Sequence, residues 1–271
     1  NDYLVIRSEN LQMIHLSEIN IIMIENGMVS ITSYLINELI NNKIKLIFCD
    51  EAHNPAGEIV PYYSSFNTSK KVQNQIKWKD EAKDIVWQQI VKHKIHNQAM
   101  LLKKLDIKGY EKLLEYEESV EVGDTTNREG HAAKVYFNLL FGKKFIRGMN
   151  DSINSGLDYG YSILLSTINK EVASKGYITQ IGINHKSEFN QFNLTCDLME
   201  PFRPLIDEIV YNSTNSEFDK KQKYKLINFL NNVIEINNKE QFVSNAIPIY
   251  IQSVFDALEN NKESKVLNYE I

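Results

Sequence analysis

The sequence is poor in the residues that mark secreted, metal-clustered or membrane-bound proteins. Among 271 residues there are 2 cysteines and 5 prolines. Cys49 and Cys196 form no metal-ligand spacing, and a reducing, cytoplasmic setting is the natural expectation for such a chain. The longest apolar runs, such as Ile21–Ile24, are far too short to cross a bilayer, so no membrane association is expected.

An excess of positive charge is also missing, because the formal net charge is −5. This alone argues against a nucleic-acid-binding protein, but the charge is unevenly distributed. Between Lys70 and Lys108, ten lysines stand against four acidic residues. Aromatic and imidazole side chains lie among them: Trp78, Trp87, His93 and His96. Such a basic stripe could follow a phosphate backbone, with Lys77, Lys79 and Lys92 as candidate contacts, or it could be an ordinary solvated helix face.

Residues 1–63 are predicted to form a small β-rich domain. Runs rich in Ile, Val and Leu predict strands at Asp2–Ser8, Leu11–His15, Ile19–Glu25, Lys45–Phe48 and Ile59–Tyr63. Pro61 should confine the last of these to an edge or a strand end. A short amphipathic helix is expected at Ser33–Asn42. The polar stretch after Tyr63 predicts a linker over residues 64–71.

Residues 72–271 are predicted to form a larger, all-helical domain, which makes the fold class α+β. From Val72 the apolar residues repeat about every 3.6 positions. The pattern predicts a long helix from Ile76 to Leu102 with one break, and helices from Thr126 or Asn127 to Gly142, from Asp151 or Ser152 to Gly176, and at Asn193–Tyr211, Lys220–Val233 and Glu240–Leu258.

The residues best suited to chemistry are concentrated between Ile181 and Asp207. This stretch contains His185, Asp197, Glu200 and Arg203. Asp197 and Glu200 are three apart, which places both carboxylates on one helix face next to Pro201. A histidine and carboxylates aimed at one point make a site for a hard cation. Glu129 is the candidate for a further ligand from elsewhere in the chain.

Each of these residues also has a purely structural interpretation. His185 could be a hydrogen-bonded surface histidine. Asp197 and Glu200 could form a solvated helix face. Thr126 and Glu129 fit the capping-box pattern, in which the glutamate binds the backbone at the helix start. Spacing alone therefore does not establish catalysis.

Two long motifs make the functional interpretation more specific. They are TNREGHAAKVYFNLLFG at Thr126–Gly142 and GINHKSEFNQFNLTCDLMEPFRPLID at Gly182–Asp207. Together with GLDYGYSILLS at Gly156–Ser166 and MIHLSEINIIMIENG at Met13–Gly27, they resemble the integrase subunit of the CRISPR adaptation machinery, in its type II-A form. The resemblance covers nearly the whole chain. The sequence has no initiator Met and, on this resemblance, lacks the usual opening β-hairpin, so we expect a start that is trimmed relative to the family.

This resemblance implies a metal-dependent DNA endonuclease and integrase that inserts the 3′-hydroxyl ends of prespacer DNA into the CRISPR repeat. Glu129, His185 and Glu200 would bind Mg²⁺ or Mn²⁺, with Asp197 as a supporting acid. Arg203 either clamps the phosphate or forms an ion pair within its own helix. A nuclease or branch resolvase without strand transfer, and a non-catalytic DNA-binding scaffold, are the alternatives.

The resemblance also implies partners. These are double-stranded DNA (prespacer and repeat), a second copy of the chain that binds through the N-terminal β domain to give a homodimer, a small ferredoxin-like adaptation subunit, the ring-forming type II-A adaptation protein, and the RNA-guided effector nuclease. Exposed strand edges and the apolar run Ile19–Ile24 are compatible with such pairing.

Overall fold

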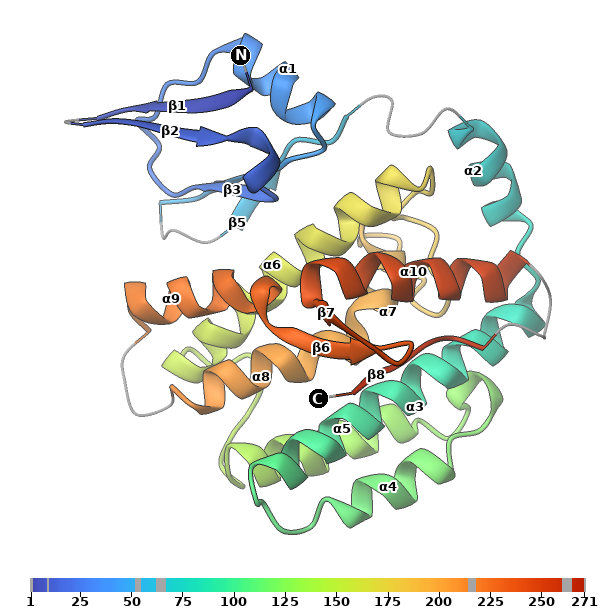
Figure 1. Cartoon of the computed structure of the whole chain (residues 1–271). Coiled ribbons are helices and arrows are strands. Elements are labelled where there is room, and N and C mark those ends of the chain that lie inside the picture. Colours follow the sequence, from blue (N-terminus) through green and yellow to red (C-terminus); the bar gives the residue numbers. More distant parts are fainter. Residues whose placement is uncertain are drawn as a thin grey trace. The chain divides into compact units, whose positions relative to one another are not determined.

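A computed structural model describes residues 2–8, 10–51, 55–61, 67–213, 218–259 and 265–270. The chain divides into two compact units, residues 1–64 and residues 65–271 (Figure 1). Helix α2 begins at Thr68, so the stretch 64–71, expected as a linker, includes the first turn of a helix.

The described residues of the first unit form two small sheets and one α-helix. Strand β1 (Tyr3–Arg7) pairs antiparallel with β2 (Leu11–His15), so the described residues themselves open with a hairpin. Strand β4 (Lys45–Cys49) lies between β3 (Ile21–Ile24), which is parallel to it, and β5 (Pro55–Glu58), which is antiparallel. Helix α1 (Ser33–Asn41) provides the connection between β3 and β4. The hydrophobic core of this unit is formed by Leu4, Leu16, Leu39, Ile44 and Leu46.

The predicted position of the last strand, Ile59–Tyr63, is wrong. The partner of β4 comes earlier, with Cys49 opposite Pro55 and Ile47 opposite Glu58. The buried Lys45 ammonium lies 2.6 Å from the Glu58 carboxylate, so an ion pair supports this register. Backbone pairing ends with the Ile59 N–H, which donates to Leu46, while Tyr62 and Tyr63 lie outside the described residues.

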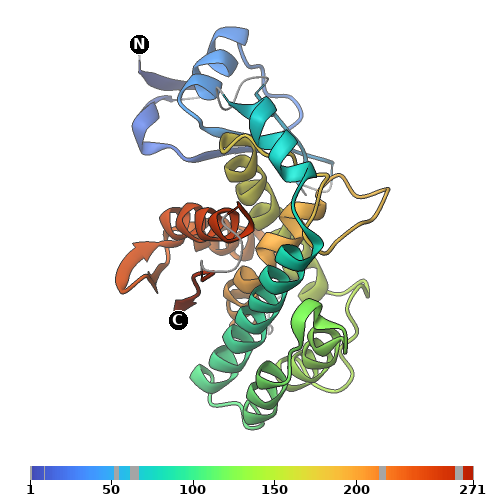
Figure 2. The same ribbon diagram turned by 90° about the vertical axis from the view of Figure 1, so that its right-hand side faces the viewer.

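The second unit is built around helix α3 (Asp80–Lys104), which follows α2 (Thr68–Ile76) after the break expected in the long helical pattern. Figure 2 shows α3 between α10 on one side and α4 and α5 on the other. The other helices are α4 (Glu111–Glu118), α5 (Arg128–Leu140), α6 (Ser152–Ser174), α7 (Asn193–Met199), α8 (Arg203–Tyr211), α9 (Lys220–Ile227) and α10 (Val243–Glu259). Short 3₁₀ turns lie at Leu16–Glu18 in the first unit, and at Val122–Asp124, Glu200–Phe202 and Asn228–Asn231.

The prediction that this second unit is all-helical is wrong. Strands β6 (Val233–Ile236), β7 (Lys239–Phe242) and β8 (Tyr269–Glu270) form a sheet in the order β7-β6-β8. Between β6 and β7, Asn237 and Asn238 have φ of 54° and 59°. Two consecutive residues at positive φ are what a two-residue type I′ hairpin turn requires, and asparagine tolerates this conformation better than most residues. The hairpin therefore replaces the end of one predicted helix and the start of the next.

Cys49 lies on β4 and Cys196 on α7. Among the described residues, none of the helices combines the length and the hydropathy needed to cross a bilayer.

Candidate active site

Glu129 lies in the first turn of α5, but it does not form the capping box that Thr126 suggested. Asn127 is the N-cap, and the carboxylate of Asp124 accepts hydrogen bonds from the first two backbone N–H groups of the helix, at 2.7 and 3.1 Å. With the helix start satisfied in this way, the Glu129 side chain points elsewhere. Its Oε1 accepts a hydrogen bond of 2.6 Å from the Nζ of Lys94.

Glu200 lies at the point where Pro201 interrupts the predicted helix Asn193–Tyr211. The chain forms a 3₁₀ turn there and resumes as α8. Glu200 is 4% exposed, so it does not belong to a solvated helix face. Its Oε1 accepts a hydrogen bond of 2.9 Å from Arg203 Nε, and its Oε2 lies 2.5 Å from Lys94 Nζ. Burial raises the pKa of Glu200, but the charges of Arg203 and Lys94 outweigh it and lower the pKa to about 2.

Lys94, on α3, therefore lies between the two glutamates. Its ammonium is within 2.6 Å of Glu129 and 2.5 Å of Glu200. Burial lowers its pKa, but the two carboxylates together raise it above the ordinary value, so the ammonium stays charged. Lys94 was counted in the sequence only as part of a basic stripe. Its spacing from Trp87 and Gln98, both buried on the same helix, is the signal that could have identified it as an inward-facing lysine.

Asp197 is fully buried and organises the loop that carries His185. Its Oδ2 accepts hydrogen bonds from the backbone N–H groups of Ile183 (2.6 Å) and Asn184 (3.1 Å). Its Oδ1 accepts from the His185 N–H (3.1 Å) and from His185 Nδ1 (2.6 Å). Gly182 is required here, because a Cβ would lie 2.4 Å from the His185 carbonyl oxygen and 2.8 Å from Asp197 Oδ2.

His185 is thereby oriented for a role at its other ring nitrogen. Since Nδ1 donates its proton to Asp197, the Nε2 atom of the neutral ring carries a lone pair. The ring packs edge-on against Trp87, with centroids 6.0 Å apart, and the side chain is 39% exposed. The hydrogen bond to Asp197, and then the charges of Asp197, Glu200 and Glu129, raise the pKa of His185 despite its partial burial.

Arg203 is supported by Tyr161, which together with Tyr136 binds Asp207. The guanidinium of Arg203 stacks over the Tyr161 ring, 4.5 Å from the centroid. Tyr161 and Tyr136 donate hydrogen bonds of 2.5 and 2.8 Å to the fully buried Asp207 carboxylate. Burial raises the pKa of Asp207 to about 6, although both tyrosine hydrogen bonds act in the opposite direction. Of the two roles considered for Arg203, the ion pair with Glu200 three residues earlier is the one observed.

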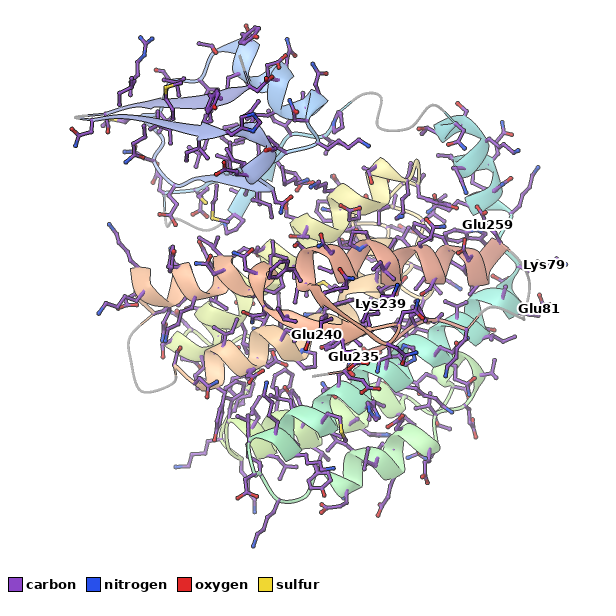
Figure 3. All side chains as sticks on the ribbon, in the orientation of Figure 1. Lys79, Glu81, Glu235, Lys239, Glu240 and Glu259 are labelled. Carbon is purple, nitrogen blue, oxygen red and sulfur yellow. The ribbon has the colours of Figure 1, made fainter. Side chains whose placement is uncertain are left out.

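The basic stripe of α2 and α3 is only partly a surface feature. Lys77 and Lys79 are exposed where the two helices meet, and Lys92 is half-buried on α3. Figure 3 shows Lys79 beside Glu81 at the start of α3. Trp78 and Trp87 are only 7% and 2% exposed, so they pack in the core and do not offer rings for stacking on bases.

The donor set suits a hard divalent cation, although the ligands are not assembled. Among the described residues, no three His, Cys, Asp or Glu side chains are gathered closely enough to hold a metal ion. Glu129 and Glu200 nevertheless converge on one cation, the Lys94 ammonium. Oε2 of Glu200 is buried and, although it is ion-paired, lacks a partner in hydrogen-bonding geometry. Carboxylate oxygens and an imidazole nitrogen are ligands that Mg²⁺ and Mn²⁺ accept.

Comparison with known proteins identifies the family. Residues 1–228 match the family described as CRISPR associated protein Cas1. The chain is 34% identical over 259 residues to the CRISPR-associated endonuclease Cas1 of Neisseria meningitidis serogroup C, a match that covers 93% of this chain and 84% of that protein. The chain belongs to the Cas1 family. A Cas1 endonuclease of Pyrobaculum aerophilum is 26% identical over 219 residues, covering 73% of this chain and 71% of the relative.

Solved structures share the Cas1 fold. A Cas1 protein from Thermotoga maritima superposes with a TM-score of 0.78 at 17% identity, covering 98% of this chain and 94% of that one. A casposase bound to an integration product has a TM-score of 0.78 at 20% identity, covering 96% and 85%. A chain of a partial Cas6-RT-Cas1–Cas2 complex has a TM-score of 0.65 at 20% identity, covering 99% and 94%.

These comparisons confirm the α+β class, with N-terminal sheets followed by a mostly helical C-terminal region. They also confirm the activity expected from the motifs, because Cas1 proteins are the CRISPR-associated endonucleases and integrases of spacer acquisition. The non-catalytic scaffold is thereby set aside.

Proposed function

We propose that this Cas1-family chain joins prespacer 3′-hydroxyl ends to the CRISPR repeat at a divalent cation held by Glu129, His185 and Glu200. The observation that carries the proposal is the convergence of two carboxylates, from α5 and from the turn at Glu200–Phe202, on one cation at 2.6 and 2.5 Å. Mg²⁺ and Mn²⁺ both suit the donor set. When bound, such an ion supplies charge neutralisation at a scissile phosphate and at the oxygens that attack it and leave it.

The chain's own residues orient the proposed metal ligands. Asp197 fixes the His185 tautomer and leaves Nε2 available as a ligand. Arg203 holds Glu200 through Nε while Tyr161 supports the guanidinium from below, so Arg203 acts here as a positioning residue. Glu200 is only 4% exposed, so solvent has little access to its carboxylate.

A strand-transfer assay tests the proposal. A short duplex with free 3′-hydroxyl ends is incubated with a supercoiled repeat-bearing plasmid, the small partner subunit and Mn²⁺ or Mg²⁺. Covalent joining is expected for the unchanged chain and is expected to fall to background for Glu129→Gln and His185→Ala. Asp80→Asn, at a side chain that is 84% exposed, is the control and should retain joining. Metal-dependent cutting without joining, lost in the same variants, would favour the nuclease or branch resolvase.

We infer a homodimer formed through the N-terminal strands. Val5 and Met13 are directly opposite each other on β1 and β2 and are 42% and 57% exposed, and the neighbouring Leu11 is 65% exposed. An apolar face of this kind on a two-stranded sheet supports burial against a second copy. Light scattering of Met13→Glu is expected to show a monomer, whereas the unchanged chain gives a dimer.

The other partners follow from the type II-A motifs. We infer that the chain binds double-stranded DNA and a small ferredoxin-like subunit, and that it associates with the ring-forming adaptation protein and the RNA-guided effector nuclease of its own locus. A solved structure titled as a Cas6-RT-Cas1–Cas2 complex supports the proposed binding of a small partner subunit. Copurification tests the subtype: the chain should copurify with the ring-forming adaptation protein and the effector nuclease of type II-A, but not with the corresponding proteins of an unrelated subtype. The cytoplasmic location stays a prediction.

Two exposed lysines are the candidate DNA contacts that a binding experiment can test first. Lys77 and Lys79 are both exposed where α2 and α3 meet, and they lack the burial that removes Lys94 from consideration. If each neutralises one phosphate, replacement of both by glutamine reduces the slope of log affinity against log salt by about 2. An unchanged slope would exclude both residues as contacts.

A further inference from the structure

Lys94 lies outside the sequence motifs that contain the proposed ligands, so the motifs do not explain its role. Its side chain is 9% exposed, and its ammonium pairs with Glu129 (22% exposed) and Glu200 (5% exposed). A buried lysine is costly unless opposite charges satisfy it. Here both of its partners are the carboxylates that we assign to the cation site. The inference below rests on that proposed function.

The two glutamates already have cations beside them without a bound ion. The strongest charges acting on Lys94 are those of Glu200, Glu129 and Arg203, and the buried Asp207 also interacts with Lys94. At Glu129 and Glu200, two carboxylates stand against one ammonium and one guanidinium. A divalent ion bound to these two carboxylates would lie beside a positive ammonium whose side chain is only 9% exposed.

The ammonium lies between the two carboxylates that would hold the metal ion. Nζ is 2.6 Å from one carboxylate oxygen and 2.5 Å from the other, so one cation already bridges the two proposed ligands. The Arg203 guanidinium differs, because it reaches Glu200 alone, through Oε1, and is held by stacking on Tyr161. Lys94 is thus the one of the two cations that bridges both proposed ligands.

We propose that Lys94 is a built-in counter-ion that holds Glu129 and Glu200 together before the metal binds, and that must release at least one of them for the metal to enter. Two consequences follow. Without metal, the ammonium stabilises the folded site. In the presence of metal, the same ammonium competes with the ion and sets the metal concentration at which the enzyme becomes active.

Lys94→Met provides the test, since methionine keeps an unbranched chain of similar length and removes the charge. Lys104→Met is the matched control: Lys104 lies on the same helix and pairs with a glutamate, Glu208, at 2.8 Å, but its side chain is 47% exposed. Mn²⁺ binding is measured by calorimetry on the whole 271-residue chain without DNA, and thermal unfolding is followed in EDTA and in Mn²⁺. Lys94→Gln, which retains hydrogen-bond donors for both carboxylates, replaces the methionine variant if that variant does not fold.

The expected result has two parts. In EDTA, Lys94→Met unfolds at a lower temperature than the unchanged chain, because two buried carboxylates lose their shared cation. Its Mn²⁺ affinity is about ten-fold higher or more, equivalent to about 1.4 kcal/mol, and Mn²⁺ raises its unfolding temperature more than that of the unchanged chain. Lys104→Met behaves like the unchanged chain in both measurements.

Other outcomes separate this inference from the proposed function. Equal or weaker Mn²⁺ binding by Lys94→Met, with binding by the unchanged chain lost in Glu129→Gln, would overturn the competition and leave the metal site intact. Binding by the lysine variant alone would support the competition in its strongest form. An absence of Mn²⁺ binding in both the unchanged chain and the lysine variant would overturn the metal site itself.

Discussion

Asp197→Asn is expected to uncouple the histidine loop from the rest of the site. The carboxylate accepts four hydrogen bonds, two on each oxygen, at 2.6 to 3.1 Å, and it is fully buried. Asparagine has nearly the same shape, but its amide nitrogen cannot accept. Whichever way the amide is turned, two of the four donors face another donor.

The cost can be worked from this count. Hydrogen bonds to a charged acceptor contribute about 1.5–3 kcal/mol each, so the two lost bonds represent about 3–6 kcal/mol. The variant no longer buries a charge, which offsets part of this loss and leaves a net destabilisation of about 3 kcal/mol. For a folded unit of this size, each kcal/mol lowers the unfolding temperature by about 2–4 °C, so we expect a decrease of about 6–12 °C.

The variant also changes the titration of His185. The hydrogen bond and the charge of Asp197 are leading reasons why the pKa of His185 is raised, so this pKa should fall in Asp197→Asn. A raised pKa in the folded state stabilises the protein below the unfolded value of 6.5, and that contribution is lost as the pH rises through the raised value. The difference in stability between the two proteins should therefore be largest at acidic pH and narrow as the pH increases.

Thermal unfolding at several pH values and NMR titration of the imidazole signals measure both effects. Asp80→Asn serves as the control, since Asp80 is 84% exposed in a loose pair of 3.6 Å with Lys83, and its replacement should change stability by less than about 0.5 kcal/mol. An unfolding temperature equal to that of the unchanged chain, or an unaltered pKa of His185, would refute the account of the loop.

Three further predictions concern other parts of the second unit. Gly160→Ala places a Cβ 2.4 Å from Ile206 Cγ2, so overpacking between α6 and α8 should cost about 1–3 kcal/mol in chemical denaturation. Asn237→Ala and Asn238→Ala should each reduce the stability of the hairpin by about 1 kcal/mol, because both residues have positive φ. Asn238→Gly should be neutral or stabilising. Amide hydrogen exchange of the hairpin measures both effects. Asp207 has its pKa raised from 3.8 to about 6 by burial, so its contribution to stability declines by about 3 kcal/mol as the pH rises through this window. Asp207→Asn lacks this decline, and urea denaturation at pH 4 and pH 7 should show the variant gaining stability relative to the unchanged chain.

Local signals predicted most of the helices because the decisive interactions are local. Asp151 caps α6 through its own carboxylate, and Gly176, with φ of 83°, follows the end of that helix, as the sequence indicated. Pro201 marks the interruption before α8. The β6–β7 hairpin was missed because its strands have four residues each, too few to establish a period of two, and because an Asn-Asn pair is a weaker turn signal than Asn-Gly.

The sequence pointed to the acids, the histidine and Arg203 of the candidate site, but not to Lys94. Glu129, His185 and Glu200 belong to motifs that can be read along the chain. Lys94 acquires its role only through contacts with Glu129, 35 positions away, and with Glu200 beyond it, which no local pattern encodes. A lysine in a stretch rich in lysine reads as surface charge, and only its helical spacing from buried residues indicates otherwise.

Asp197 and Glu200 demonstrate how much one broken turn determines. In sequence they are two acids three apart, equally suited to one helix face. Because Pro201 interrupts the helix directly after Glu200, the two carboxylates serve different structures: Asp197 holds the histidine loop, and Glu200 holds the charge cluster. Both are buried: Asp197 accepts four hydrogen bonds, and Glu200 is held by Arg203 and Lys94. If the histidine and the two glutamates hold one ion, as we propose, a cation already in the cluster has to give way, and Lys94, which bridges both glutamates, is the group whose release would allow it.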